Sequence, residues 1–396
     1  MDKGGEQRES YTYTYDNKGN ITQVKDSKGT TTYVYDELEQ LVKETQPDGT
    51  VTEYTYDATG NRLTKKVTQN GIATTTNYSY DDADQLTQVD GQAHTFDKNG
   101  NLTHDGKRTY VYDAENRLTA VKEGEKTLAS FTYRADGMRK TMTTGSQTIT
   151  FHYDGNNNVI YETDQNNQIV AHYTYGANNE LVSMTRGGKT YYYQTNYWGD
   201  VTALTDSTGE VVATYEYDAF GNLLKETGTV ENPYRYAGYR YDEVTGLYYL
   251  QSRYYNPETG RFLTRDTFEG FEDEQLSLNK YVYTANNPVM FVDPDGMAYK
   301  YVTTLKGSTK WQKTLLKAAL AALVWRLGGS LAGGAVGVLS AVIDDFLPRS
   351  KYVKTKVYYK KSGKKLTYKY VSTYYKKSNY TGYIRTKTRY RTVKLK

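Results

Sequence analysis

The chain has 396 residues and a net charge of +4, with 44 tyrosines, 9 phenylalanines, 6 prolines and no cysteine. The absence of cysteine excludes a disulfide framework and a thiolate metal site. Tyrosine and threonine favour strands, whereas asparagine, aspartate and glycine favour tight turns, so the composition predicts a mainly β protein.

The charge is unevenly divided along the chain. Residues 349–396 hold 17 lysine or arginine residues and no acid, whereas residues 1–348 hold 33 basic and 46 acidic residues, a net charge of −13. Such an asymmetry predicts a basic tail that binds an anionic partner. The first residues lack the apolar core of a signal peptide. We therefore expect a piece of a longer exported precursor, secreted or associated with the cell wall.

A tyrosine-aspartate pair followed by a turn of glycine and asparagine recurs about every twenty residues between residues 8 and 230. In residues 51–67, Tyr54 and Tyr56 alternate with polar residues as in a strand, and residues 57–61 form a turn. A single hairpin is marginally stable in water, so the units are expected to stack and share a core. We assign the tyrosine-aspartate pairs to packing rather than to chemistry.

The repeat ends near residue 232, and a different segment follows up to residue 297. Its motifs include Tyr-Arg-Tyr-Ala-Gly-Tyr-Arg-Tyr-Asp from Tyr234, Arg-Tyr-Tyr-Asn-Pro-Glu-Thr-Gly-Arg-Phe from Arg253, and Asp-Pro-Asp-Gly-Met from Asp293.

The repeats and this segment together resemble the Rhs/YD-repeat family, which includes teneurins and wall-associated proteins of Gram-positive bacteria. The resemblance implies a β-spiral shell over residues 1–231, a partial cage open at its N-terminal end. It implies a plug, the Rhs repeat-associated core, over residues 232–297. Residues 298–396 are then the exchangeable effector domain of a polymorphic toxin, which the shell encloses and delivers in competition between bacteria.

The resemblance also implies self-cleavage by two carboxylates that share a proton, as in aspartic proteases. Carried over by position, the carboxylates are Asp266 and Asp293, Arg265 is a modulator, and the cut falls between Met297 and Ala298. The first motif departs from the family pattern, since Asp266-Thr-Phe-Glu-Gly replaces Asp-Pro-x-Gly. The alternative is that both aspartates only hold turns.

The effector domain is expected to be a small α+β domain, with one long helix or a helical hairpin over residues 310–347. Residues 318–343 contain one charge, Arg326, which approaches the ~20 apolar residues of a spanning helix. Gly329, Gly333 and Gly337 form a small-residue stripe that lets helices pack closely in a bilayer. This pattern favours a membrane-active effector, and the alternative is a buried pair of shorter helices.

Residues 349–396 predict a basic β-meander with strands at 351–361, 364–375 and 380–395. Interleaved basic and tyrosine residues suit phosphate backbones with stacked bases, and they suit an anionic lipid surface equally. The candidate residues for an anionic partner are Lys360, Lys361, Lys364, Lys365, Lys376, Lys377, Arg385, Arg389 and Arg391.

The residues missing from this end also restrict the chemistry. All four histidines precede residue 173, and Asp344 and Asp345 are the only acids after Asp295. A nuclease that depends on histidine or glutamate, a metal nuclease and a deaminase are therefore hard to build here. We expect no metal, no cofactor and no catalytic constellation within residues 298–396.

Three functions remain open for the effector. The first is a membrane-active toxin whose partner is the target-cell membrane or another anionic polymer. The second is a histidine-independent RNase or a nucleic-acid-binding toxin. The third is a wall-bound adhesin or structural protein. A toxin of either kind implies a cognate immunity protein as a further partner.

Overall fold

The computed structural model describes residues 9–176, 179–267, 275–293, 296, 300–307, 353–362, 365–375 and 383–394. The chain falls into two compact units. The first comprises residues 1–13 and 23–297, and the second comprises residues 14–22 and 298–396. The predicted domain boundaries at residues 231 and 297 stay predictions.

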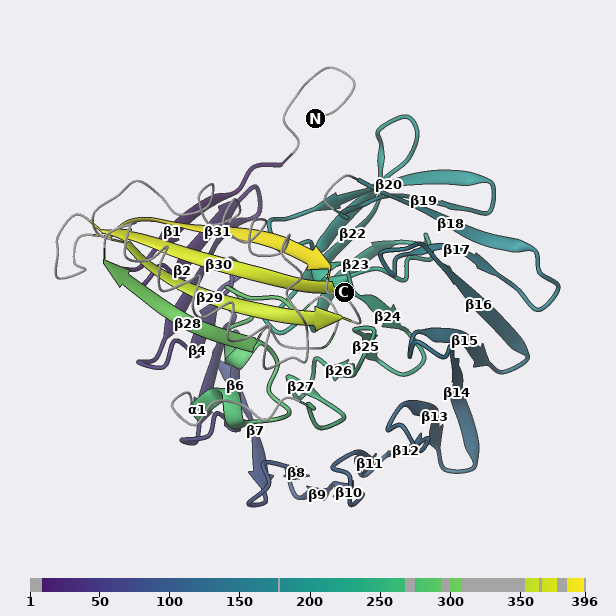
Figure 1. Ribbon diagram of the computed structural model, residues 1–396, viewed down its shortest axis with the longest axis horizontal. Helices are drawn as coiled ribbons and strands as arrows, with labels where there is room; N and C mark the ends of the chain where they lie inside the picture. Colours follow the sequence, from purple (N-terminus) through teal and green to yellow (C-terminus); the bar gives the residue numbers. More distant parts are fainter. Residues whose placement is uncertain are drawn as a thin grey trace. The chain divides into compact units, whose positions relative to one another are not determined.

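The described part of the repeat region forms a nine-stranded and a fourteen-stranded sheet, in which neighbouring strands are consecutive in the chain (Figure 1). The first sheet contains β1 (Thr12–Tyr15), β2 (Ile21–Asp26), β3 (Gly29–Tyr35), β4 (Leu41–Thr45), β5 (Val51–Tyr56), β6 (Arg62–Gln69), β7 (Ile72–Tyr80), β8 (Leu86–Val89) and β9 (Gln92–Ala93). The second contains β10 (Thr95–Phe96), β11 (Leu102–His104), β12 (Arg108–Tyr112), β13 (Leu118–Glu123), β14 (Lys126–Tyr133), β15 (Arg139–Thr144), β16 (Gln147–Tyr153), β17 (Val159–Thr163), β18 (Ile169–Tyr175), β19 (Leu181–Arg186), β20 (Lys189–Thr195), β21 (Val201–Thr205), β22 (Val211–Tyr217) and β23 (Leu223–Gly228).

The aspartate of each repeat closes the turn of its hairpin. Asp57 Oδ1 accepts hydrogen bonds from the backbone N–H groups of Thr59 and Asn61 at 2.9 and 2.8 Å. Gly60 adopts a φ of 85°, a left-handed conformation that glycine reaches without steric strain. The same side-chain bonding recurs around Asp97 and Asp154. The predicted hairpins are confirmed, with β5 and β6 paired antiparallel.

The tyrosine of each repeat ties its hairpin to the preceding one. The Tyr56 hydroxyl donates to the Leu41 carbonyl oxygen at 2.7 Å, and the Tyr153 hydroxyl donates to the Arg139 carbonyl oxygen at 2.6 Å. Tyr80, Tyr112, Tyr133, Tyr175 and Tyr217 repeat this bond. A phenylalanine would remove the hydroxyl that binds each of these carbonyl groups, which explains why tyrosine is favoured at these positions.

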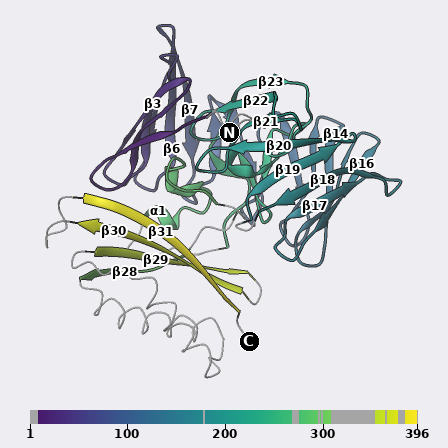
Figure 2. The same cartoon turned by 90° about the horizontal axis from the view of Figure 1, so that it is seen from above.

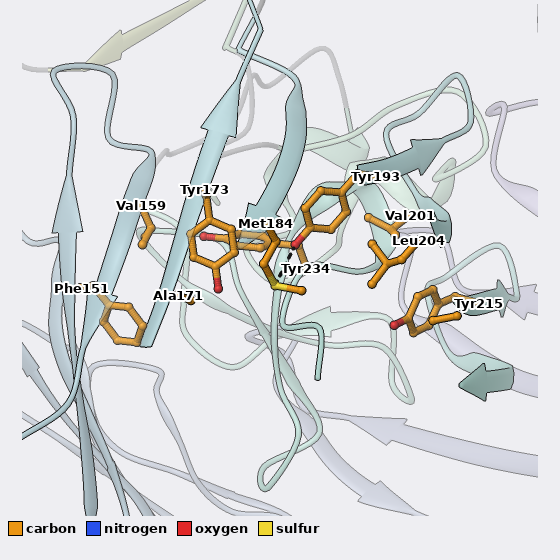
Figure 3. Packing of buried hydrophobic residues seen from close by; sticks show 11 residues of the cluster. Phe151, Val159, Ala171, Tyr173, Met184, Tyr193, Val201, Leu204, Tyr215 and Tyr234 are labelled. Carbon is orange, nitrogen blue, oxygen red and sulfur yellow. Dashed lines mark hydrogen bonds between the residues drawn. The ribbon is translucent and has the colours of Figure 1, made fainter. Parts of the chain in front are cut away.

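Apolar side chains from successive strands form the core between the sheet and the plug. In one cluster, Tyr173 packs edge-on against Tyr234 with ring centroids 5.1 Å apart (Figure 3). The Tyr193 hydroxyl lies 3.6 Å from Met184 Sδ in the same cluster. Tyr234 belongs to the segment after the repeats, so this core joins the shell to the plug.

The strand path of the first unit returns to its beginning. Lys28, between β2 and β3, forms an ion pair at 3.0 Å with Glu216 of β22. Figure 2 labels β3 and β22, the strands that carry or adjoin the two residues. The Ala219 N–H after β22 donates to Glu44 Oε2 of β4. Lys65 of β6 lies 3.2 Å from Asp218. We call this set of contacts the seam. A cavity of about 1260 Å³ lies beside it, lined mostly by residues of β2–β4, β6 and β20–β23.

The plug is built from short elements and binds the main chain of the repeat turns. Tyr236, Tyr248 and Tyr255 donate their hydroxyls to the carbonyl oxygens of Ala219, Gly221 and Phe220. Asn286 likewise donates to the Gly60 carbonyl at 2.7 Å. The plug elements are η1 (Tyr236–Gly238), β24 (Arg240–Asp242), β25 (Leu247–Tyr249), β26 (Tyr254–Asn256), β27 (Arg261–Phe262), α1 (Gln275–Leu278) and η2 (Thr284–Asn286).

The second unit contains an antiparallel sheet in the order β28-β29-β30-β31. Its strands are β28 (Lys300–Gly307), β29 (Val353–Ser362), β30 (Lys365–Tyr375) and β31 (Tyr383–Lys394). The three strands expected in the basic tail are confirmed, whereas β28 was not predicted. The expected helix over residues 310–347 lies outside the described residues. Among the residues that the structure does describe, no helix is long and apolar enough to cross a membrane.

Candidate functional site

The two predicted carboxylates meet at one arginine of the plug. Arg253 Nη2 lies 2.9 Å from Asp266 Oδ2 and 3.6 Å from Asp293 Oδ2. Arg253 and Asp293 are almost fully buried, and the Asp266 side chain is 12% exposed. Asp266 and Asp293, 27 positions apart in the sequence, therefore converge on one cationic group.

Arg253 also holds the backbone around the predicted cleavage point. Its Nε donates to the Gly296 carbonyl oxygen at 2.6 Å, and its Nη1 donates to the Lys280 carbonyl oxygen at 3.1 Å. The guanidinium carbon lies 3.6 Å from the ring centroid of Phe262, a cation–π contact that fixes the plane of the group. The planar fork of arginine is what allows these partners to be bound at once.

Gly296 fits this arrangement because it has no side chain. Its φ is +67°, and a Cβ atom added there would approach the Leu250 carbonyl oxygen to 2.8 Å and the backbone nitrogen of Arg253 to 3.0 Å. The glycine of the Asp-Pro-Asp-Gly motif is therefore required both by its backbone conformation and by its close packing. This packing brings the residue before Met297 against the loop that carries Arg253.

Asp293 is positioned by a pair of buried tyrosines. Its backbone N–H donates to the Tyr239 hydroxyl at 2.7 Å, and the Tyr239 and Tyr283 hydroxyls lie 2.9 Å apart. Burial and then the nearby Asp293 carboxylate raise the pKa of Tyr239 well above its usual value. Tyr239 is consequently neutral at physiological pH and keeps its hydroxyl proton for hydrogen bonding.

The arrangement has the parts of a hydrolytic centre for one peptide bond. Two carboxylates lie beside one guanidinium, and that guanidinium also binds the Gly296 carbonyl next to the predicted cut. One carboxylate can then accept a proton from water while the other donates a proton to the departing amine. Met297 and Ala298, between which the cut is predicted, lie outside the described residues.

Arg265, the third residue predicted for self-cleavage, does not lie where Arg253 lies. Arg265 is exposed and lies beside Gly100 at a repeat turn, whereas Arg253, which the sequence analysis did not single out, binds the carboxylates. The signal was its place directly before Tyr254 and Tyr255, which are both buried, since a buried arginine needs partners. The expected role of Arg265 stays a prediction.

The effector residues are placed only in part. Lys360, Lys361, Lys365, Arg385, Arg389 and Arg391 occupy positions in β29, β30 and β31. Lys364, Lys376, Lys377, Arg326, Gly329, Gly333 and Gly337 lie outside the described residues. In the part of the chain that is described, no group of three or more histidine, aspartate or glutamate residues could hold a metal ion.

Residues 1–289 match the teneurin YD-shell family, and the chain belongs to it. The expected membership of the wider group of Rhs/YD-shell proteins is thereby confirmed. The chain is 48% identical over 268 residues to the tRNA nuclease WapA of Bacillus subtilis strain 168. It is 42% identical over 268 residues to the tRNA3(Ser)-specific nuclease WapA of Bacillus spizizenii. Each match covers 66% of this chain and 12% of the relative, so the chain spans about an eighth of their length.

Solved structures with the same fold belong to a toxin complex. The crystal structure of TcdB2-TccC3 without its hypervariable C-terminal region superposes with a TM-score of 0.61 and 21% identity, covering 75% of this chain and 17% of that one. At this identity the likeness shows the fold alone. It confirms the mainly β shell architecture that the repeats predicted.

Proposed function

We propose that the chain is part of a polymorphic toxin whose shell and plug carry a C-terminal effector, and that the effector acts on RNA. The observation that carries the first part is the YD-shell match over residues 1–289. The toxin is secreted or held at the cell wall, its shell encloses the effector, and a cognate immunity protein protects the producing cell.

The second part of the proposal rests on two observations. Two relatives that share 42% and 48% identity with this chain are named as tRNA nucleases. The described strands of the second unit, β28 to β31, are rich in lysine, arginine and tyrosine, the residue types that bind phosphates and stack on bases. The apolar glycine-rich residues 318–343 support the membrane-active alternative, which the same experiment tests.

The plug supplies the release step in this proposal. Asp266 and Asp293 share one proton and hydrolyse the Met297–Ala298 bond, one activating water and the other protonating the amine of Ala298. Arg253 is a positioning residue, because it holds both carboxylates and the Gly296 carbonyl. Hydrolysis of this bond separates residues 298–396, which include β28, from the plug.

The purified full chain is tested on tRNA and on dye-loaded vesicles of anionic lipid, beside a control chain that ends at residue 297. We expect the full chain to degrade tRNA and to leave the vesicles intact, with no activity in the control. Dye release with intact tRNA would overturn the RNA proposal in favour of the membrane-active effector. If neither substrate is affected, the effector proposal is wrong and a wall-bound structural role remains.

A further inference from the structure

The register of the second unit places the arginines of β31 on one face of the sheet and most lysines of β29–β31 on the other. β30 and β31 are paired without interruption from Lys365↔Lys394 to Tyr374↔Arg385, and β29 and β30 are paired without interruption over ten positions. In a strand, alternate residues share a face, so an unbroken register keeps each face constant along the whole ladder.

One face combines the arginines of the sheet with tyrosines. Arg385, Arg389 and Arg391 occupy alternate positions of β31, with Lys387 between them in the same row. Their partners on β30 are mostly tyrosines: Tyr374↔Arg385, Tyr370↔Arg389 and Tyr368↔Arg391. We call these positions, with Ser372 opposite Lys387, the arginine-tyrosine face.

The other face differs in composition although its charge is also positive. Its positions on β29 and β30 include Lys354, Lys356, Lys360 and Lys369, and its positions on β31 include three threonines, Thr386, Thr388 and Thr392. All three arginines of β28–β31 therefore lie on the arginine-tyrosine face. This segregation gives two faces of like charge and unlike chemistry.

Arginine and tyrosine in adjacent rows suit an unpaired nucleic acid strand. Alternate positions of β31 are about 6.8 Å apart, and the neighbouring tyrosine row is about 4.8 Å away. Arginine binds phosphate through two parallel N–H groups, which lysine does not. Tyrosine presents a ring on which any base can stack. The combination offers charge to the backbone and a stacking surface to the bases of the same strand.

Resting on the proposed action on RNA, we propose that the arginine-tyrosine face of β30 and β31 is the binding site for single-stranded RNA. The phosphates lie along the edge strand β31, and the bases lie over β30. Because β31 is the last strand in the order β28-β29-β30-β31, its row stands at the border of the sheet. Paired RNA fits this site poorly, because its bases are not free to stack on side chains.

Two directly paired positions on each face provide matched variants. Arg389→Gln and Tyr370→Leu alter one cross-strand pair of the arginine-tyrosine face, and Lys369→Gln and Tyr390→Leu alter the adjacent pair on the other face. The full chain is titrated with a short fluorescent single-stranded RNA whose 2′-hydroxyls are methylated, so that cleavage does not interfere. Thermal unfolding verifies that each variant is folded.

We expect Tyr370→Leu to weaken binding about tenfold. We expect Arg389→Gln to weaken binding and to reduce the slope of log K against log salt by about 0.7. Lys369→Gln and Tyr390→Leu should bind within about twofold of the wild type. Equal losses on both faces, equally tight binding of double-stranded RNA, or no binding by the wild type would each overturn the site.

The two proposals fail in different ways. If the wild type cleaves tRNA but the four variants bind alike, the RNase proposal stands and the binding face is wrong. If the face binds as expected but tRNA survives, the binding face stands and the cleavage proposal is wrong.

Discussion

Arg253 illustrates how much a single guanidinium determines in the plug. It contacts Asp266, Asp293, the Gly296 carbonyl and the ring of Phe262, which come from two stretches of the chain, residues 262–266 and 293–296. The sequence resemblance predicted both carboxylates, because aspartates in recognisable motifs carry over by position. It did not predict Arg253, since the partner of a buried cation is decided by long-range packing rather than by local pattern.

Removal of one carboxylate should abolish self-cleavage. With Asp293→Asn the site loses the group that would accept or donate the proton, so we expect cleavage to slow by about 100-fold or more. Intact-mass analysis of the purified chain should show full-length protein for this variant and a break after Met297 for the wild type. Asp295→Asn, two residues further on, is the matched control and should be cleaved. A full-length wild type would refute the proposed hydrolysis.

Arg253→Lys tests positioning separately from charge. Lysine keeps the positive charge but lacks the planar fork that reaches Gly296 and both carboxylates. We expect slower cleavage of a folded chain and a changed pH profile of the remaining cleavage, because a single ammonium cannot stay in contact with both carboxylates at once. Cleavage at the wild-type rate and with the wild-type pH profile would show that Arg253 has only a structural role.

The repeat tyrosines should stabilise the shell through their hydroxyls. Tyr153→Phe keeps the ring and leaves the Arg139 carbonyl without its 2.6 Å partner. We expect a loss of about 1 kcal/mol in the free energy of unfolding, measured by urea denaturation. The control is Tyr192→Phe, because Tyr192 is 42% exposed. Equal effects of the two substitutions would show that the hydroxyl bond is not the reason for tyrosine.

At the scale of elements, the shell and plug are joined by buried ion pairs. Arg139 Nη1 of β15 lies 2.5 Å from Asp242 Oδ2 of β24, and the two side chains are 0% and 1% exposed. The Arg139 guanidinium also lies over the rings of Phe151 and Tyr249. A buried pair of this kind contributes little net stability relative to apolar residues, but the loss of one partner leaves a charge in an apolar site.

Asp242→Asn should therefore destabilise the first unit strongly. We expect a loss of about 3–5 kcal/mol, because the Arg139 charge remains buried without its counter-ion. Arg134 and Asp136 also form an ion pair, at 2.8 Å, but their side chains are 42% and 47% exposed. Asp136→Asn is thus the matched control and should change stability by less than about 0.5 kcal/mol. Similar losses of stability in both variants would show that the buried ion pair between β15 and β24 contributes no more than an exposed one.

The elements themselves were largely predictable where their signals are local. Tyr54, Tyr56 and the turn at Asp57 predicted a hairpin correctly, because strand alternation and turn chemistry are both contained in one repeat. The strands of the basic tail were also predicted to within three residues at each end. β28 was missed, since its residues pair with β29 more than forty positions away and carry no turn signal of their own.

At the scale of the whole chain, the seam of the first unit contains a buried acid. Glu44 is 2% exposed, and its Oε2 accepts from the Ala219 N–H on the far side of the seam. Burial, and after it the Asp218 carboxylate, raise the pKa of Glu44 to about 8. The hydrogen bond from Ala219 and the charge of Lys65 lower this pKa and offset part of the rise. The early and late strands therefore meet at a group that gains its charge near neutral pH.

Stability should fall as the pH rises through this range. The pKa of Glu44 is higher in the folded chain than in the unfolded one, so its contribution is complete in acid and is lost between about pH 5 and pH 8. Glu44→Gln removes this titration, and we expect the melting temperature of the variant to depend less on pH over that window. Glu53→Gln is the control, because Glu53 is exposed. An unchanged pH dependence in Glu44→Gln would show that other groups control the seam.

The hold of the plug on Ala219, Phe220 and Gly221 has a consequence for how such chains diverge. Three tyrosine hydroxyls bind main-chain oxygens, which every amino acid supplies. Mutations that alter side chains in the repeats therefore leave these anchor points in place, provided that the turn keeps its shape. The same plug sequence can accordingly bind repeats of very different sequence. Repeats exchanged between distant genes should still bind the plug.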